Sequence, residues 1–341
     1  MRVLAAPDKF KGSATAHEVA AAIGHACWEL GVECVEIPMA DGGDGLLEVL
    51  GGANRTTVVT GPLGDPIAAA WRLSGFTAVI EMAQASGLIL AGGAAGNQPL
   101  DATTTGTGEL IDHALDAGAK RIIVGLGGSA TTDGGFGAIR AITAIARLKQ
   151  VELLVACDVS TLFVDAAKVF GPQKGATSTQ IKFLNRRLNR LVQMFVEDFD
   201  VDVSTIEGGG AAGGLGGALA ALGGRLVPGF ELVADELNLF DHLDPDNPHS
   251  VDLVITGEGC LDDTSFAGKV VGGIAELAAD AGIPVAAVVG SADAGVVDDH
   301  RNHIQVAVLS EMYGLDAALS EPKLHIEQAA ADIVGTFLNN R

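Results

Sequence analysis

Residues 121–128 read RIIVGLGG, an apolar run of strand length that leads directly into a glycine-rich turn. The same order recurs at 1–8 (MRVLAAPD), 151–158 (VELLVACD) and 251–259 (VDLVITGEG). Segments with apolar residues at helical spacing, such as 15–30, lie between these runs. Strands that alternate with helices are typical of a mostly parallel sheet with both faces covered. The sequence therefore predicts an α/β fold.

A different pattern lies between the runs at 1–8 and 121–128. Residues 57–73 (TVVTGPLGDPIAAAWRL) contain Gly-Pro and Asp-Pro turn signals, and 76–83 (FTAVIEMA) is a further strand candidate. Strand runs joined by such short turns favour antiparallel pairing. Farther on, residues 180–199 carry leucines on one helical face and basic residues on the other, which predicts an amphipathic helix with a solvated basic face.

The charge of the chain limits its partners. Its 341 residues contain 43 Asp and Glu against 21 Lys and Arg, for a net charge of −22. Such a field repels nucleic-acid phosphates and anionic lipids, so we expect neither nucleic acid nor membrane as a partner. The four cysteines have no CxxC spacing and no export signal is visible, which favours free thiols in the cytoplasm.

Polar residues gather directly after the predicted strands. These candidates are Asp8, Lys9, Lys11 and Ser13; Asp41 to Gly45; Ser129, Thr131, Thr132 and Asp133; Asp158; and Glu258, Asp262, Asp263 and Lys269. In α/β enzymes ligands bind beyond the carboxyl ends of the strands. Carboxylates there would suit Mg²⁺, and glycines would let the backbone approach phosphate. Ordinary turn chemistry is the alternative at any single position.

Two segments could bind a phosphate group, although neither is a standard nucleotide-binding loop. Residues 208–217 (GGGAAGGLGG) could bring backbone N–H groups to an anion at a helix start, or could reflect close packing of small residues. Residues 169–176 (VFGPQKGA) hold Lys174 in a turn, where it could place a charge on a transferring phosphoryl group or lie on the surface. A Walker A loop is absent.

Taken together, the motifs of residues 3–291 resemble those of bacterial glycerate kinases of the first type. The strings that carry the resemblance are APDKFKGS, PMADGGDG, VIEMAQASGL, TTTGTGELI, GLGGSATTDGG, ACDV, VFGPQKGA, GGGAAGGLGG and ITGEGCLDDTSFAGK. The resemblance implies phosphorylation of D-glycerate by ATP and Mg²⁺, with 2-phosphoglycerate as the favoured product. It also implies a Rossmann- or flavodoxin-like parallel three-layer lobe (residues 1–61 and 259–341) and a central α/β lobe with a mixed sheet (62–258). The substrates would bind between the lobes, and the protein would be a monomer or homodimer.

The matching motifs also assign the expected site residues. The catalytic residues would be Asp8, Lys11, Asp41 and Lys174. Those that bind substrate would be Ser13, Glu81, Ser86, Ser129, Thr131 and Asp133. Nucleotide would contact Gly210, Gly213, Gly214 and Lys269, and Mg²⁺ would be held by Asp158, Glu258 and Asp262. An aspartate, Asp41 or Asp8, would orient or deprotonate the attacking hydroxyl, while lysines would offset the charge of the transferring group.

The chain departs from the family pattern in places, and these departures keep two alternatives open. Lys9 replaces a usual serine, and only the short stretch 136–153 (FGAIRAITAIARLKQVEL) intervenes between the GGSAT motif and ACDV. The stretch after ACDV, residues 160–167 (STLFVDAA), lacks an expected arginine and its turn. The alternatives are a kinase for another small hydroxy acid and a non-catalytic ligand-binding relative of the kinase fold.

Overall fold

The computed structural model describes residues 1–266, 268–293, 295–300 and 304–340. The chain divides into two compact units. Unit 1 comprises Met1–Asp41 and Phe230–Arg341, and unit 2 comprises Gly42–Gly229. The α/β class and the two-part organisation predicted above are confirmed.

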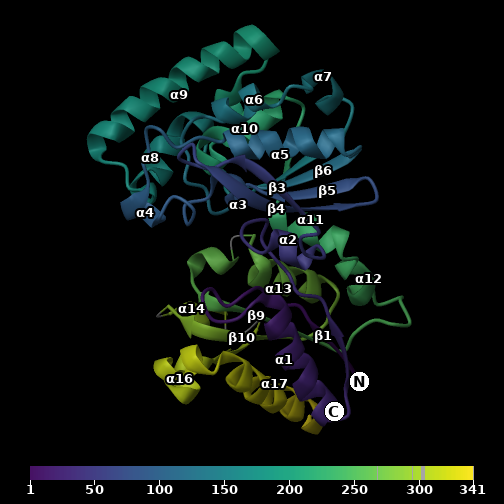
Figure 1. The fold of residues 1–341 in the computed structure, drawn as a ribbon. Helices are drawn as coiled ribbons and strands as arrows, with labels where there is room; N and C mark the ends of the chain where they lie inside the picture. Colours follow the sequence, from purple (N-terminus) through teal and green to yellow (C-terminus); the bar gives the residue numbers. More distant parts are fainter. Residues whose placement is uncertain (267, 294, 301–303, 341) are drawn as a thin grey trace. The chain divides into compact units, whose positions relative to one another are not determined.

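Unit 1 is built on a parallel sheet of five strands in the order β11-β10-β9-β1-β2. The strands are β1 (Arg2–Ala5), β2 (Glu33–Glu36), β9 (Leu253–Leu261), β10 (Val285–Ala292) and β11 (Gln305–Val308). Helices α1 (Ala16–Glu29) and α17 (Pro322–Asn339) lie side by side against one face, and α13 (Val270–Asp280) covers the other (Figure 1). Apolar residues of α1, α17 and the strands bury one another on the first face, and α13 on the second face completes the three layers.

The shorter helices of unit 1 connect these elements. They are α11 (Gly229–Glu236), α12 (Leu239–Leu243), η4 (Asp263–Phe266), α14 (Val296–His300), α15 (Leu309–Tyr313) and α16 (Leu315–Ser320). Helix α1 begins with a capping box, because the Thr15 hydroxyl accepts from the Glu18 N–H while the Glu18 carboxylate accepts from the Thr15 N–H.

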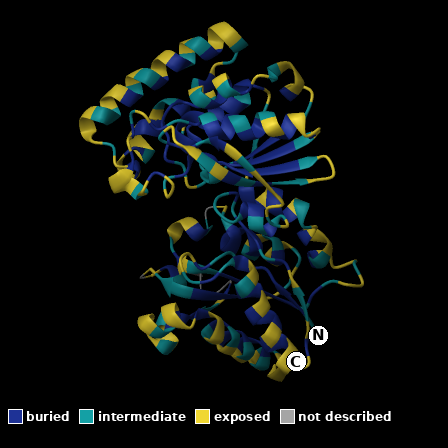
Figure 2. Ribbon diagram, viewed as in Figure 1, coloured by how far each residue is buried: buried dark blue, intermediate teal, exposed yellow. Residues whose placement is uncertain are grey.

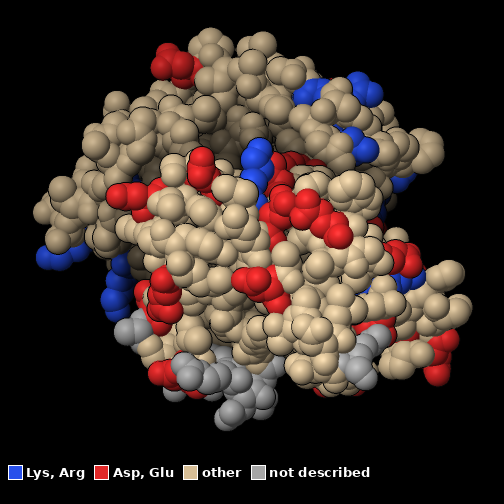
Figure 3. All heavy atoms as spheres, turned by 90° about the horizontal axis from the view of Figure 1, so that it is seen from below, with Lys and Arg blue, Asp and Glu red and all other residues tan. Residues whose placement is uncertain are grey.

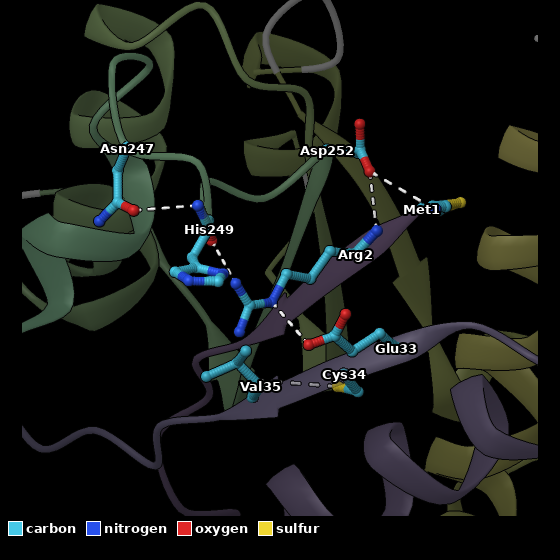
Figure 4. Close-up of polar contacts among 8 residues, drawn as sticks. All are labelled: Met1, Arg2, Glu33, Cys34, Val35, Asn247, His249 and Asp252. Carbon is cyan, nitrogen blue, oxygen red and sulfur yellow. Dashed lines mark hydrogen bonds and ion pairs between the residues drawn. The ribbon is translucent and has the colours of Figure 1, made fainter.

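Arg2 joins the two distant ends of the chain that form the sheet of unit 1 (Figure 4). Its backbone N–H donates to Asp252 at 2.7 Å, directly before β9, and its guanidinium lies 3.0 Å from Glu33 of β2. The same guanidinium donates to the carbonyl of His249 at 2.6 Å. The backbone and the side chain of Arg2 together thus tie β1 to β2 and to the segment that leads into β9.

Unit 2 contains a mixed sheet of six strands in the order β3-β4-β5-β6-β7-β8. The strands are β3 (Arg55–Thr60), β4 (Pro66–Ser74), β5 (Thr77–Glu81), β6 (Arg121–Gly125), β7 (Glu152–Ala156) and β8 (Arg225–Val227). The first three pair antiparallel and the rest parallel, as the turn signals around Gly61 and Asp65 predict. Figure 2 shows the strands at the centre of this sheet as buried.

Unit 2 also contains α-helices and short 3-10 helices (η). They are α2 (Leu46–Val49), α3 (Ala83–Ser86), α4 (Gly93–Gly96), α5 (Thr105–Asp116), α6 (Phe136–Ala141), α7 (Ile145–Leu148), η1 (Phe163–Asp165), α8 (Ala166–Phe170), η2 (Pro172–Lys174), α9 (Ser178–Phe199), η3 (Val203–Thr205) and α10 (Ala211–Ala221). The amphipathic prediction for residues 180–199 is confirmed, since Leu184, Leu188 and Phe195 are buried while Lys182 and Arg186 are exposed.

The boundaries of the units differ from the expected ones at 61/62 and 258/259. Strand β9 pairs with both β1 and β10, so residues 253–258 belong to the sheet of unit 1. Strand β3 pairs with β4, which places residues 55–60 in unit 2. The chain crosses at 41/42 and 229/230 instead. The local sequence pattern does not show which strands pair when they lie so far apart in the chain.

Two surface properties follow from the composition. Acidic side chains are spread across the face of the molecule that Figure 3 presents, in keeping with the net charge of −22. None of the helices formed by the described residues combines the length and the apolar character needed to cross a bilayer.

Candidate active site

A buried lysine organises the polar residues of unit 2. Lys174 ends η2 and is only 2% exposed, so the expectation of a surface lysine does not hold here. Its ammonium donates to the Ser129 hydroxyl at 2.7 Å and to the Thr131 carbonyl at 2.6 Å. Burial lowers the pKa of Lys174 to about 7, while the negative charge of Asp133 opposes that shift. We call Lys174, Ser129, Thr131 and Asp133 the lysine cluster.

Asp133 anchors the loop that follows β6. Its carboxylate accepts from the Thr104 N–H at 2.9 Å and the Thr104 hydroxyl at 2.8 Å. It also accepts from the N–H groups of Gly135 and Gly137, both at 3.1 Å. Four donors satisfy a buried carboxylate, and they fix the loop 128–135 to the start of α5.

Asn97 belongs to this site although the sequence interpretation did not include it. Its side-chain amide donates to the carbonyls of Ala130 (3.0 Å) and Lys174 (2.9 Å), and so joins the turn that carries the lysine to the loop that carries its partners. The Oδ1 atom of Asn97 is buried and has no hydrogen-bond partner. No spacing rule signals such a residue, because its role depends on two distant loops meeting.

Two other predicted substrate residues make contacts within the protein. The hydroxyls of Ser86 and Thr107 lie 2.9 Å apart, and the Ser86 carbonyl accepts from the Ala130 N–H. The Glu81 carboxylate accepts from the N–H groups of Gly45 and Leu47 at 2.9 and 2.8 Å. Burial raises the pKa of Glu81, and these hydrogen bonds oppose the rise. Glu81 therefore fixes the short helix α2 in place.

The glycine-rich segment 208–217 packs closely against the lysine cluster. A Cβ atom on Gly213 would lie 2.0 Å from the Thr131 carbonyl oxygen, and one on Gly210 would lie 2.4 Å from the Leu162 carbonyl oxygen. Gly213 and Gly214 also have positive φ angles of 68° and 100°. Close packing alone therefore requires glycine here, and a contact of this segment with nucleotide stays a prediction.

Unit 1 holds a second group of polar residues at the carboxyl ends of its strands. Asp8 follows β1, Asp41 follows β2, and Glu258 lies within β9, three residues before its end. Burial raises the pKa of Asp8 to about 6, and the Asp41 charge adds to the rise while Lys9, 3.6 Å away, opposes it. Burial raises the pKa of Glu258 to about 7, with a further contribution from Asp8. We call Asp8, Asp41 and Glu258 the carboxylate cluster.

The remaining predicted residues of unit 1 lie in the segments that follow β1 and β9. They are Lys11, Ser13, Asp262 and Lys269. The Asp262 carboxylate accepts from the N–H groups of Thr264 and Ser265, and the Lys269 ammonium donates to the Thr264 hydroxyl at 2.6 Å. Lys11 is exposed, and Ser13 donates to the Phe10 carbonyl in a tight loop. The Lys11 side chain is therefore open to solvent or to a ligand, whereas Ser13 is half-buried and its hydroxyl is bonded within the loop.

The carboxylate cluster has the character of a cation site. Glu258 Oε1 is buried and lacks a hydrogen-bond partner, and Asp8 lies close enough to Glu258 to raise its pKa. Carboxylate oxygens of this kind suit a hard divalent cation such as Mg²⁺. The predicted metal ligands come from both units, because Asp158 follows β7 in unit 2 and Glu258 and Asp262 belong to unit 1.

A different group of side chains has possible metal-ligand atoms that lie close to one another. Among the residues that the structure describes, three metal-type ligand atoms lie within 4.8 Å of one another only at His25, Glu29 and Glu327 on α1 and α17. His25 and Glu327 form an ion pair of 2.8 Å, and His25 and Glu29 are exposed. These residues lie outside both clusters defined above.

Comparison with known proteins gives consistent matches. The model of the "Glycerate kinase family" matches residues 3–146 and 143–338. The glycerate 2-kinase of Escherichia coli K12 is 40% identical, covering 99% of this chain and 98% of its own, and a glycerate kinase of Halalkalibacterium halodurans is 39% identical over 97% of each. A crystal structure of a Salmonella typhimurium LT2 protein assigned as glycerate kinase 2 matches with a TM-score of 0.82 and 36% identity, over 100% of this chain and 99% of that one.

Proposed function

Since this chain belongs to the glycerate kinase family, we propose that it transfers the γ-phosphoryl group of ATP to D-glycerate with the help of Mg²⁺ and forms 2-phosphoglycerate. The family and the full-length relatives identify the protein as a kinase that phosphorylates glycerate. The name of the relative from Escherichia coli supports the 2-position of the product.

The observation that carries the proposal is the carboxylate cluster. A buried carboxylate oxygen without a partner, at Glu258, costs free energy unless a ligand satisfies it. Mg²⁺ bound there would neutralise charge on the phosphates of ATP. We propose that Glu258 and Asp262 hold the cation, together with Asp8.

The other residues take roles that follow from their surroundings. Asp41 orients the attacking hydroxyl of glycerate, or accepts its proton, because it lies at the strand end beside Asp8. Lys11 and Lys269 offset the charge of the anionic substrates, and Ser13 contributes a hydroxyl. In unit 2, Lys174 fixes the loop of Ser129 and Thr131 and supplies positive charge under it.

Purified protein with ATP, Mg²⁺ and D-glycerate tests the proposal directly. We expect ADP release that depends on glycerate, and a phosphorus NMR spectrum that identifies 2-phosphoglycerate rather than 3-phosphoglycerate. Asp41→Ala and Lys11→Ala should each abolish most of the activity. Activity that survives both substitutions would contradict the assignment of these residues.

Two further measurements separate the alternatives. A panel of small hydroxy acids would identify a kinase of different specificity, because another acid would then give the higher kcat/KM. Calorimetric binding of glycerate or nucleotide without any turnover would identify a non-catalytic relative.

A further inference from the structure

We propose that a pocket in unit 2 binds a small organic phosphate. Of the residues assigned above to glycerate and ATP, only Asp133 belongs to its lining. The pocket has a volume of about 480 Å³ and lies between the loop 100–105, α5, α6 and α9. That volume falls in the range of sites for small metabolites. Asp133 of the lysine cluster contributes to its wall, whereas the Lys174 side chain lies outside its lining.

Two arginines with free hydrogen-bond donors line this pocket. The guanidinium of Arg140 lies 5.6 Å from the centre of the Phe136 ring, and Arg187 donates to the Leu100 carbonyl at 2.9 Å. Within the described residues, neither arginine forms an ion pair with a carboxylate. The chain has 43 carboxylates and only 21 basic side chains, so most arginines have an acidic side chain available to them. Two arginines without such a partner in one pocket therefore indicate a site for an anionic ligand. Guanidinium groups bind phosphate in a bidentate manner.

Three carboxylates also line the pocket, but within the described residues none of them forms an ion pair with Arg140 or Arg187. Asp133 already accepts hydrogen bonds from Thr104 and two glycine N–H groups. Glu109 accepts from the N–H and the hydroxyl of Thr60 at 2.6 and 2.9 Å. Asp101 is exposed at the edge, where water screens its charge. The remaining donors of the pocket are therefore available to an incoming anion.

The rest of the lining indicates more than a bare phosphate ion. The hydroxyls of Thr103 and Thr105 lie beside the first turn of the 12-residue helix α5, whose N-terminal end attracts negative charge. Apolar surface from Leu100, Ala102, Phe136 and Ala141 fills much of the remaining wall. A phosphate group on a short carbon chain would satisfy both parts, with its phosphate at the arginines.

Calorimetric titration of the full-length protein with glycerol 3-phosphate, and separately with inorganic phosphate, tests this site without ATP or glycerate. We expect saturable binding that is tighter for glycerol 3-phosphate. Arg140→Ala should weaken it by about tenfold or more, since a charge-assisted hydrogen-bond pair is lost. Arg140 is exposed, so its removal should leave the fold intact, and Arg187→Ala gives a second variant of the same pocket.

Arg186→Ala is the matched control, because Arg186 precedes Arg187 on α9 but is exposed and does not line the pocket. Its binding constants should equal those of the unmodified protein. Absence of saturable binding, or equal losses in Arg140→Ala and Arg186→Ala, would overturn the proposal. Equal affinity for both probes would overturn its organic part. None of these outcomes depends on kinase activity, so the proposed function is judged separately.

Discussion

Lys174 donates a hydrogen bond of 2.7 Å to the hydroxyl of Ser129, although 45 positions separate the two residues in the chain. The contact joins the turn after α8 to the loop after β6, and the lysine is buried beneath that loop. A buried ammonium is costly, so its hydrogen bonds and the charge of Asp133 are needed to hold it there. The predictions below begin with this arrangement.

The stability of the protein should depend on pH through Lys174. Its pKa is about 7 in the folded protein, below the ordinary value of 10.5, so above pH 7 the unfolded chain binds more protons. Stability then rises with pH, because the folded protein no longer carries the buried charge. Relative to Lys174→Met, the free energy of unfolding of the unmodified protein should rise by on the order of 2 kcal/mol between about pH 7 and 9.

Urea unfolding at a series of pH values measures this difference. Lys182→Met is the control, because Lys182 is exposed on α9 and its removal should leave the pH profile unchanged. If the profiles of Lys174→Met and the unmodified protein run parallel, Lys174 is not a buried titrating group.

Asn97 should act as a positioning residue for the lysine cluster. In Asn97→Asp, the carbonyls of Ala130 and Lys174 lose their donor and face a carboxylate, so we expect a loss of about 1–3 kcal/mol in stability. We also expect kcat to fall by about tenfold while KM for glycerate changes less. Asn189→Asp, on the exposed face of α9, is the control. A change confined to stability would show that Asn97 has only a structural role.

The sequence predicts most of the fold, because alternation of strand and helix is a local signal. The runs at 121–128 and 251–259 become β6 and β9, and the turn signals near Gly61 predict the antiparallel strands of unit 2. The boundaries between units escape such reasoning, since β1 and β9 pair across about 250 residues. Hydrophobic pattern within either strand is equally compatible with another neighbour.

The candidate site is predicted less completely than the fold. The motifs identify Asp8 and Lys174 as polar residues in loops, but they do not show that burial moves the pKa of both toward neutrality. The resemblance predicts that Glu81 binds substrate, which stays a prediction, and the sequence does not show that its carboxylate also holds the backbone of α2. Which partner a side chain finds depends on tertiary packing, and for Asn97 no local pattern carries that information.

Glu258 should determine the requirement for Mg²⁺. Glu258→Gln keeps the shape of the side chain but removes the charge that the buried Oε1 would offer to a cation. The Mg²⁺ concentration that gives half-maximal activity should rise by about tenfold or more. Asp263→Asn is the control, since Asp263 is exposed in the adjacent loop. An unchanged Mg²⁺ dependence in Glu258→Gln would exclude this residue as a ligand.

Gly213 should tolerate no side chain, whatever its role toward nucleotide. A Cβ atom there would lie 2.0 Å from the carbonyl oxygen of Thr131, which the ammonium of Lys174 holds in place, and the φ angle of 68° adds strain. Gly213→Ala should therefore cost more than about 3 kcal/mol. Gly223→Ala separates the two causes, because Gly223 has a φ angle of 97° but no atom within 4 Å of its Cβ position. It should cost about 1 kcal/mol. Chemical unfolding of the two variants gives the difference directly, and equal costs would mean that strain at φ, rather than contact with the lysine cluster, requires glycine at position 213.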